Sequence, residues 1–240
     1  MNDFRVETDI SVPNEPKPIQ QTLTLFKDGV AYDFSRDEPE MITMVDPQRQ
    51  RIVLFDSKRQ VQLPIDMQKF MQFMKSAHEQ VDSPDLPNLL LNREDAKRVY
   101  VDAEQKTVRV GEKILRYEAS LQTPPQAEMS VYYAQFADAS AALNAWRASS
   151  PPPFARNALN AAIAAQKAIP SEITRTAFFH KGERVIEQVV TCRLHANWRL
   201  SKDDEAQIES VGRMLVSYQV VDVPLFYKKP EASPVTTAAK

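Results

Sequence analysis

The sequence predicts an α+β protein built on a curled antiparallel β-sheet, unclosed and half-barrel-like, with helices packed on its concave face. Short β-rich runs joined by Asp-, Pro- and Gly-containing turns fill the first part of the chain, and such runs are typical of consecutive hairpins. A second block of runs follows later, and a helical insert divides it. Because strands within each block are sequence neighbours, we expect antiparallel pairing.

The chain of 240 residues has 43% apolar and 26% charged residues, which is ordinary globular composition. We expect a single α+β domain over residues 1–227 and a disordered Pro-, Ala- and Thr-rich tail over 228–240. The expected elements, in order, are strands over 3–63, a helix over 65–81, strands over 98–119, the helical insert over 126–169, strands over 172–200 and a helix over 202–218.

The turns between early strands share one plan, in which an apolar residue ends a strand, Asp opens the turn and a basic residue closes it. The three examples are Val45–Arg49, Phe55–Arg59 and Val101–Lys106. Repeated carboxylates are compatible with a metal site, but an Asp carboxylate also accepts backbone N–H bonds two residues further on. The turn geometry is the favoured interpretation.

Each predicted helix has a recognisable boundary or apolar face. The first begins at Pro64 and Asp66, with Asp66 as a candidate N-cap, and carries a Met-rich stripe at helical spacing. Such a stripe forms either an adaptable binding surface or, more commonly, core. Pro151–Pro153 ends the first helix of the insert and precedes the second. Ser201 and Asp204 resemble a capping box at the start of the last helix.

Composition argues against several classes of function. The net charge of −2 lacks the basic excess of a nucleic-acid-binding protein. No run of about 18 apolar residues occurs, so no integral membrane segment is expected. The N-terminus has no basic start followed by an apolar core, which predicts a cytoplasmic protein if Met1 is the native start and allows a periplasmic one otherwise.

Catalytic chemistry has no support in the sequence. Cys192 is the only cysteine, which excludes an intramolecular disulfide and a Cys-based metal site. A Cys192–His195 dyad fails because a three-residue offset in a strand places the side chains on opposite faces. The three histidines do not pair at metal-ligand spacing, and no nucleotide-binding or hydrolase motif occurs. We therefore predict no enzyme, no catalytic residue, no metal and no cofactor.

A long strand over 184–200 carries two different faces. Alternate residues on one face are apolar, namely Val190, Cys192, Leu194, Ala196, Trp198 and Leu200. The other face carries Arg193, His195 and Arg199, which form a candidate contact for an anionic head group. A solvated outer face explains the same pattern, and the alternation of half-exposed sheets favours that interpretation.

Several early strands are apolar on both faces. Ile52 and Leu54 point one way and Val53 and Phe55 the other. Such strands need cover on both sides, from a second helix layer, a protein partner or an apolar ligand. The candidate ligand-binding residues are Val53, Phe55, Phe70, Met74, Trp146 and Trp198.

Five segments resemble a family of uncharacterised bacterial proteins, and the resemblance covers nearly the whole chain. They are Phe4–Thr8, Leu23–Phe34, Ile42–Pro47, Arg51–Asp56 and Asn197–Leu200. The strand order of that family is in turn similar to the outer-membrane lipoprotein carrier superfamily, in which a curled sheet cups helices and an apolar cavity. The resemblance implies an unclosed barrel with a helical lid, and it implies no catalytic residue.

Two hypotheses about function follow. The leading one is a non-enzymatic protein that binds an apolar or lipid-like ligand between the curled sheet and the helices. The alternative is a structural or interaction protein that has no ligand and oligomerises through an apolar sheet face. The partner is accordingly an apolar ligand or a protein, with no nucleic acid expected.

Overall fold

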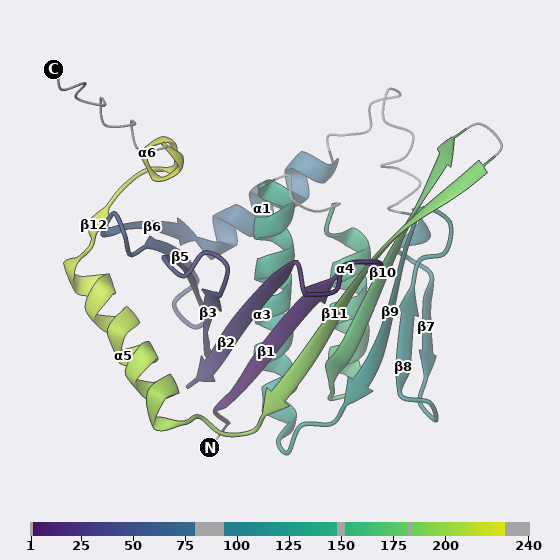
Figure 1. Cartoon of the computed structure of the whole chain (residues 1–240), viewed down its shortest axis with the longest axis horizontal. Coiled ribbons are helices and arrows are strands. Elements are labelled where there is room, and N and C mark those ends of the chain that lie inside the picture. Colours follow the sequence, from purple (N-terminus) through teal and green to yellow (C-terminus); the bar gives the residue numbers. More distant parts are fainter. Residues whose placement is uncertain (1, 80–93, 148–151, 182–183, 229–240) are drawn as a thin grey trace, which may run out of the picture.

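One sheet contains every strand of the described chain. The computed structural model describes residues 2–79, 94–147, 152–181 and 184–228 (Figure 1). Its 12 strands follow the spatial order β12-β6-β5-β4-β3-β2-β1-β11-β10-β9-β8-β7 and do not close into a barrel. The strands are β1 (Phe4–Ser11), β2 (Gln20–Lys27), β3 (Val30–Ser35), β4 (Met41–Asp46), β5 (Arg51–Asp56), β6 (Val61–Asp66), β7 (Val99–Asp102), β8 (Thr107–Val110), β9 (Leu115–Gln122), β10 (Ile169–Lys181), β11 (Arg184–Asn197) and β12 (Gln219–Val220).

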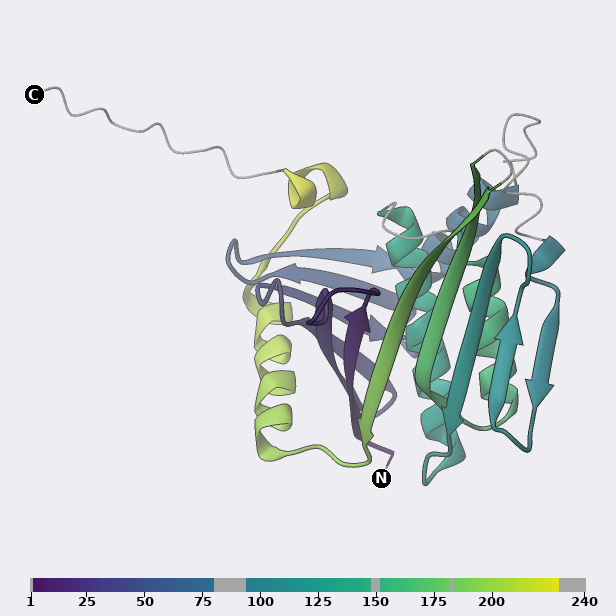
Figure 2. The same ribbon diagram turned by 45° about the vertical axis from the view of Figure 1, so that its right-hand side comes forward.

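The two predicted strand blocks join where the first strand meets the last long one. β1 pairs antiparallel with β11, and this register sets Thr8 opposite Leu194 and Ile10 opposite Cys192. β10 and β11 form a hairpin that extends beyond the neighbouring strands (Figure 2). Only β12 pairs in parallel, with β6. The α+β class and the unclosed curled sheet are therefore confirmed.

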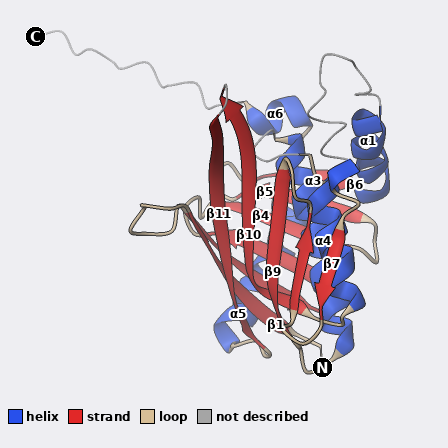
Figure 3. Cartoon of the chain, turned by 90° about the vertical axis from the view of Figure 1, so that its right-hand side faces the viewer, coloured by secondary structure: helices blue, strands red, loops and turns tan. Residues whose placement is uncertain are grey.

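Three helices lie against the concave face of the sheet (Figure 3). They are α1 (Met67–Glu79), α3 (Ala127–Trp146) and α4 (Phe154–Ala165). Their buried residues merge with inward-facing residues of both strand blocks into one core cluster. Phe70 and Met74 belong to that cluster, so the Met-rich stripe of α1 is core, as the commoner interpretation holds.

The last long helix lies on the opposite face of the sheet, where a second helix layer was one of the three covers considered. α5 (Lys202–Ser217) crosses the strands of the N-terminal block (Figure 1). Its Val211 packs in a cluster with Val53 and Phe55, while Ile52 and Leu54 belong to the concave-face core. The two-sided apolar strands are thus confirmed, and their second cover is a helix.

The chain enters α5 through an anchored cap. The Ser201 hydroxyl accepts from the Asp204 backbone N–H at 3.1 Å, and an Asp204 carboxylate oxygen accepts from the Ser201 backbone N–H at 2.8 Å. The predicted capping box is therefore confirmed. Arg5 of β1 donates to the Asp204 carboxylate at 3.0 Å, and the Asp204 side chain is only 1% exposed. This buried ion pair ties the start of the helix to the sheet.

The Asp-containing turns are held by their own backbone, which confirms the turn interpretation. The backbone N–H donors lie three residues after each Asp rather than two. Arg49 donates to Asp46 at 3.1 Å, Arg59 to Asp56 at 2.9 Å and Gln105 to Asp102 at 2.9 Å. The residue after each donor has a positive φ. A turn residue in the left-handed region followed by a strand is typical of longer hairpin loops.

Other boundaries differ from the sequence prediction. β6 continues to Asp66, so the first helix begins at Met67, although Asp66 caps it as predicted by accepting from the Lys69 N–H at 2.9 Å. Pro64 is tolerated inside β6 because the strand beyond Gln62 pairs only with β5, and proline lacks the N–H that a second neighbour would need. The short α6 (Val223–Tyr227) and β12 were not predicted. The predicted tail lies outside the described residues, apart from Lys228.

Candidate functional site

A cavity of about 560 Å³ lies between the concave face of the sheet and helices α3 and α4. Strands of both blocks line it, from β1 to β4 and from β9 to β11. The volume falls within the roughly 300–1,000 Å³ of small-molecule sites. The cavity exists because the β1–β11 pairing brings the two blocks into one curved wall while α3 spans the opening.

Part of the wall is apolar. Ile10 and Leu194 contribute from the paired β1 and β11, Ile173 from β10, and Phe136 and Leu143 from α3. Cys192 also faces the cavity, and burial raises the pKa of its thiol while the charges of Arg156 and Arg175 oppose the rise. A thiol held in its protonated form acts here as a small apolar group.

The wall formed by the first four strands carries a row of polar side chains. The row consists of Thr8, Thr22, Thr24, Asp33 and Thr43. Thr24 and Thr43 are the cross-strand partners of Asp33 on either side. The Thr24 hydroxyl donates to the Asp33 carboxylate at 2.7 Å. These residues occupy inward positions, and the next strand, β5, places the core residue Leu54 opposite Thr43.

Asp33 is the titratable group in this row of side chains. It is half-buried and lines the cavity. Burial raises its pKa from 3.8 to about 6, against the opposing effects of the Thr24 hydrogen bond and the charge of Arg147. The charge of this wall therefore changes between mildly acidic and neutral conditions.

Two arginines lie on the other side of the cavity. Arg156 comes from the first turn of α4, and Arg175 from the middle of β10. Burial raises the pKa of the Tyr117 and Tyr133 phenols, and the charge of Arg156 opposes the rise at both. Among the described residues, neither arginine forms an ion pair with a carboxylate. The lining thus combines apolar, hydroxyl, carboxyl and cationic groups.

The C-terminal segment reaches the rim of the cavity. Arg147, an exposed lining residue just after α3, donates from Nε to the Tyr227 hydroxyl at 3.1 Å. The neighbouring Trp146 ring packs edge-on against Tyr227, with 5.8 Å between ring centroids. α6 is therefore fixed to the end of α3 beside the opening.

The six candidate ligand-binding residues lie elsewhere in the fold. Val53 and Phe55 pack under α5 on the convex face. Phe70 and Trp146 meet edge-on at 5.7 Å between centroids, and Trp198 lies 6.0 Å from Phe4. Met74 belongs to the concave-face core. None of the six is among the described residues that line the cavity.

The predicted anion contact faces away from the cavity. Because Cys192 and Leu194 line it, the alternation of β11 directs Arg193 and His195 to the opposite face, where both are exposed. Arg193 pairs with Glu172 at 3.1 Å, and Arg199 follows the strand at an exposed position. The separation of Cys192 from His195 by strand alternation is confirmed.

Few features of the sequence indicate which charged groups line the cavity. Arg175 lies between Ile173 and Ala177 on the inward face of β10, where both neighbours are core residues. Asp33 lies similarly two residues after the core residue Ala31. A charged residue that interrupts an inward apolar alternation is the signal that identifies both. Arg156, on a helix, offers no comparable signal.

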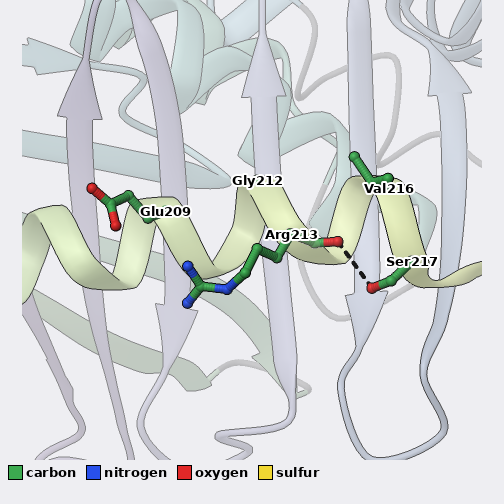
Figure 4. A pocket seen from close by; sticks show the side chains of 5 residues that line it. All are labelled: Glu209, Gly212, Arg213, Val216 and Ser217. Atoms are coloured by element: carbon green, nitrogen blue, oxygen red, sulfur yellow. Dashed lines mark hydrogen bonds between the residues drawn. The ribbon is translucent and has the colours of Figure 1, made fainter.

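A second hollow, of about 670 Å³, is bounded by a single helix (Figure 4). Its five lining residues all belong to α5: Glu209, Gly212, Arg213, Val216 and Ser217. The Ser217 hydroxyl donates to the Arg213 carbonyl at 2.9 Å, and Val216 is 89% exposed. This hollow is the solvent-facing side of a helix, and its side chains do not converge on one space as those of the cavity lining do.

Comparison with known proteins adds no family to this picture, because no protein-family model and no curated protein matches the chain. Within the described residues, no helix is long and apolar enough to cross a membrane. In the same part of the chain, no three His, Cys, Asp or Glu side chains gather as metal ligands would.

Proposed function

We propose that this protein is a non-enzymatic binding protein that holds an apolar or lipid-like molecule in the cavity on the concave face. The observation that carries the proposal is the contrast between two covers. α5 packs directly on the convex face, whereas α3 and α4 leave about 560 Å³ over the concave one. Apolar side chains together with polar groups that converge on one space are typical of ligand sites.

The resemblance to the lipoprotein-carrier superfamily supports the same proposal, because its members hold apolar groups between a curled sheet and helices. The alternative, association through an apolar sheet face, has less to rest on. The strands that are apolar on both faces have Val211 and its neighbours on α5 as their second cover. We therefore place the binding surface inside the fold rather than on it.

The test uses a neutral environment-sensitive dye, 1-N-phenylnaphthylamine, and a variant that fills the cavity. Ala141 of α3 lines the cavity, so Ala141→Trp should abolish the increase in dye fluorescence. Ala206, exposed on α5, provides the matched control, and Ala206→Trp should bind the dye as the wild type does. Circular dichroism and thermal unfolding establish that both variants fold.

Two results would overturn the proposal. One is equal binding of the dye by the wild type and a folded Ala141→Trp variant. The other is the absence of binding by the wild type for the dye and for alkyl amphiphiles of any head group. Native mass spectrometry of protein purified without detergent provides an independent measurement, since a retained lipid appears as a discrete added mass.

A further inference from the structure

Arg156 and Arg175 converge on one part of the cavity although they come from different elements. Both line it, and the positive charges of both act on the same Cys192 thiol. Arg175 pairs across the sheet with Tyr117 of β9 and Val190 of β11, which also line the cavity. The two guanidinium groups therefore lie near the same thiol in the cavity wall.

Among the described residues, no carboxylate forms an ion pair with either guanidinium, although Arg175 interacts with the Tyr117 phenol and Arg156 with the Tyr133 phenol. The Arg175 Nε is buried and has no hydrogen-bond partner among the described residues. The acidic group that Arg156 influences, Asp138, accepts from Asn160 at 2.8 Å, and burial raises its pKa. A buried or half-buried guanidinium without a carboxylate is unfavourable unless another anion supplies the partner.

The start of α4 adds to the positive potential. Arg156 lies in the first turn of this 12-residue helix, whose N-cap residue is Pro153, a cavity-lining residue that provides no side-chain cap. Helix N-termini attract anions because the backbone dipoles align there. A planar guanidinium also binds carboxylate or phosphate oxygens through two parallel hydrogen bonds.

We propose that Arg156 and Arg175 form a head-group site, so that the ligand of the cavity is an anionic amphiphile. Its carboxylate or phosphate group lies between the two arginines, and its alkyl chain runs along Ile10, Leu194 and Phe136. This inference rests on the proposed function, since it specifies the ligand class of the same cavity. The exposed Arg193 and Arg199 take no part in it.

The experiment compares ligands that share a chain and differ in head group. Dodecanoate, dodecyl phosphate and dodecanol are titrated below their aggregation limits, at low ionic strength, to displace 1-N-phenylnaphthylamine. We expect at least one anion to bind more than about tenfold tighter than dodecanol. Dodecanoate and dodecyl phosphate, as separate arms, distinguish a carboxylate from a phosphate head group. Added salt should reduce the preference for the anion, because screening weakens charge pairing.

Two variants assign the preference to residues. Arg156→Gln/Arg175→Gln should reduce the preference for the anion to about twofold or less while dodecanol binding remains, because only charge pairing is lost. Arg193→Gln, on the opposite face, should leave the preference unchanged. Should the double variant fail to fold, the single Arg156→Gln variant and the salt dependence of the wild type provide the same readout.

The outcomes separate this inference from the function beneath it. Equal affinity of the wild type for dodecanol and both anions overturns the head-group site and leaves a neutral apolar ligand for the cavity. An anion preference that survives in the folded double variant also overturns it. Failure of the dye and of all three alkyl compounds to bind overturns the proposed function itself.

Discussion

The two faces of the N-terminal strands differ in what covers them, although alternate residues of the same strands form both faces. On the convex face, Val53 and Phe55 pack against Val211 of α5 and are 1% and 0% exposed. On the concave face, Thr43 and Asp33 border a cavity. Polar residues at inward positions, beneath a helix that lies at a distance from the sheet, border a cavity. Apolar residues beneath a helix that packs directly on the sheet form core.

The largest test of this comparison truncates one large aromatic residue on each side. Phe55→Ala removes a fully buried ring from the face under α5, and we expect the free energy of unfolding to fall by about 3–5 kcal/mol. Phe136→Ala removes a half-buried ring that borders the cavity, and the loss should be about half as large because no new void is created in closed core. Urea unfolding of both variants measures the difference.

Equal losses in the two variants would contradict the comparison, because they would mean that the concave face is packed as densely as the convex one. Phe136 also meets Phe26 edge-on at 5.6 Å between centroids, so some loss from aromatic contact is expected. Dye binding is the second readout, since only Phe136→Ala enlarges the cavity.

The attachment of α5 gives the next largest effect. Asp204→Ala removes the capping box together with the ion pair to Arg5, and we expect a loss of about 3 kcal/mol. Asp203, its exposed neighbour in the same turn, is the matched control, and Asp203→Ala should cost no more than about 1 kcal/mol. Thermal unfolding at low salt compares the two variants. If Asp204→Ala were as mild as Asp203→Ala, the cap would not be what holds the second cover in place.

Sequence patterns predicted the sheet well because its strands alternate and its hairpins are local. The opposite directions of Ile52 and Val53 followed from alternation alone, and so did the separation of Cys192 from His195. The capping box at Ser201 was local as well. Each of these features depends on residues within a few positions of one another.

The cavity was not predictable in the same way, because it depends on contacts between distant segments. The pairing of Thr8 with Leu194 joins the two ends of the chain, and no local pattern specifies it. The candidate residues were chosen for aromatic or apolar character, and such residues are the ones that fill core: Phe70 and Val53 did so. The residues that line the space also include small and charged ones, such as Thr43 and Arg156, which were not among the candidates.

The polar wall has a pH dependence that comes from Asp33. Burial raises the pKa of Asp33 to about 6 in the folded protein, above its ordinary 3.8, so the folded state binds the proton more tightly than the unfolded chain. The contribution of Asp33 to stability is therefore fully present below about pH 4, declines as the pH rises to about 6, and stays low above that.

Asp33→Asn removes this dependence while its side-chain oxygen can still accept from Thr24. At about pH 8 the variant should be more stable than the wild type by about 1–2 kcal/mol, and at about pH 4 the two should be equal. Thermal unfolding across this range measures the difference, with Asp37→Asn, an exposed position, as the control. A constant difference at all pH values would show that the carboxylate is not desolvated by the cavity wall.

The smallest expected effect concerns the segment that continues from α5 to the cavity rim. Arg59 donates through Nε to Asp56 at 2.6 Å and through Nη1 to the Leu225 carbonyl at 3.1 Å, and its guanidinium lies 5.6 Å from the centre of the Phe226 ring. Burial favours the neutral form of Asp56, but the hydrogen bonds from Arg59 outweigh it and lower the pKa of that carboxyl below 3.8. One side chain therefore joins a hairpin turn to the end of α6.

Arg59→Gln should reduce the free energy of unfolding by only about 1 kcal/mol, since the pair is partly exposed and the segment is short. The part of the loss that comes from the Asp56 pair should be largest near neutral pH and disappear as the pH falls through the lowered pKa of Asp56, because protonation removes that partner in both proteins. Limited proteolysis should cleave after residue 218 faster in the variant, while Lys58→Gln, whose side chain is exposed, leaves the rate unchanged. Unchanged cleavage in Arg59→Gln would mean that the Tyr227 contact with Arg147 alone holds α6 at the cavity rim. That result would link the two faces of the sheet. The segment that follows α5, the cover of the convex face, would then be held by its contact with the end of α3 on the concave face.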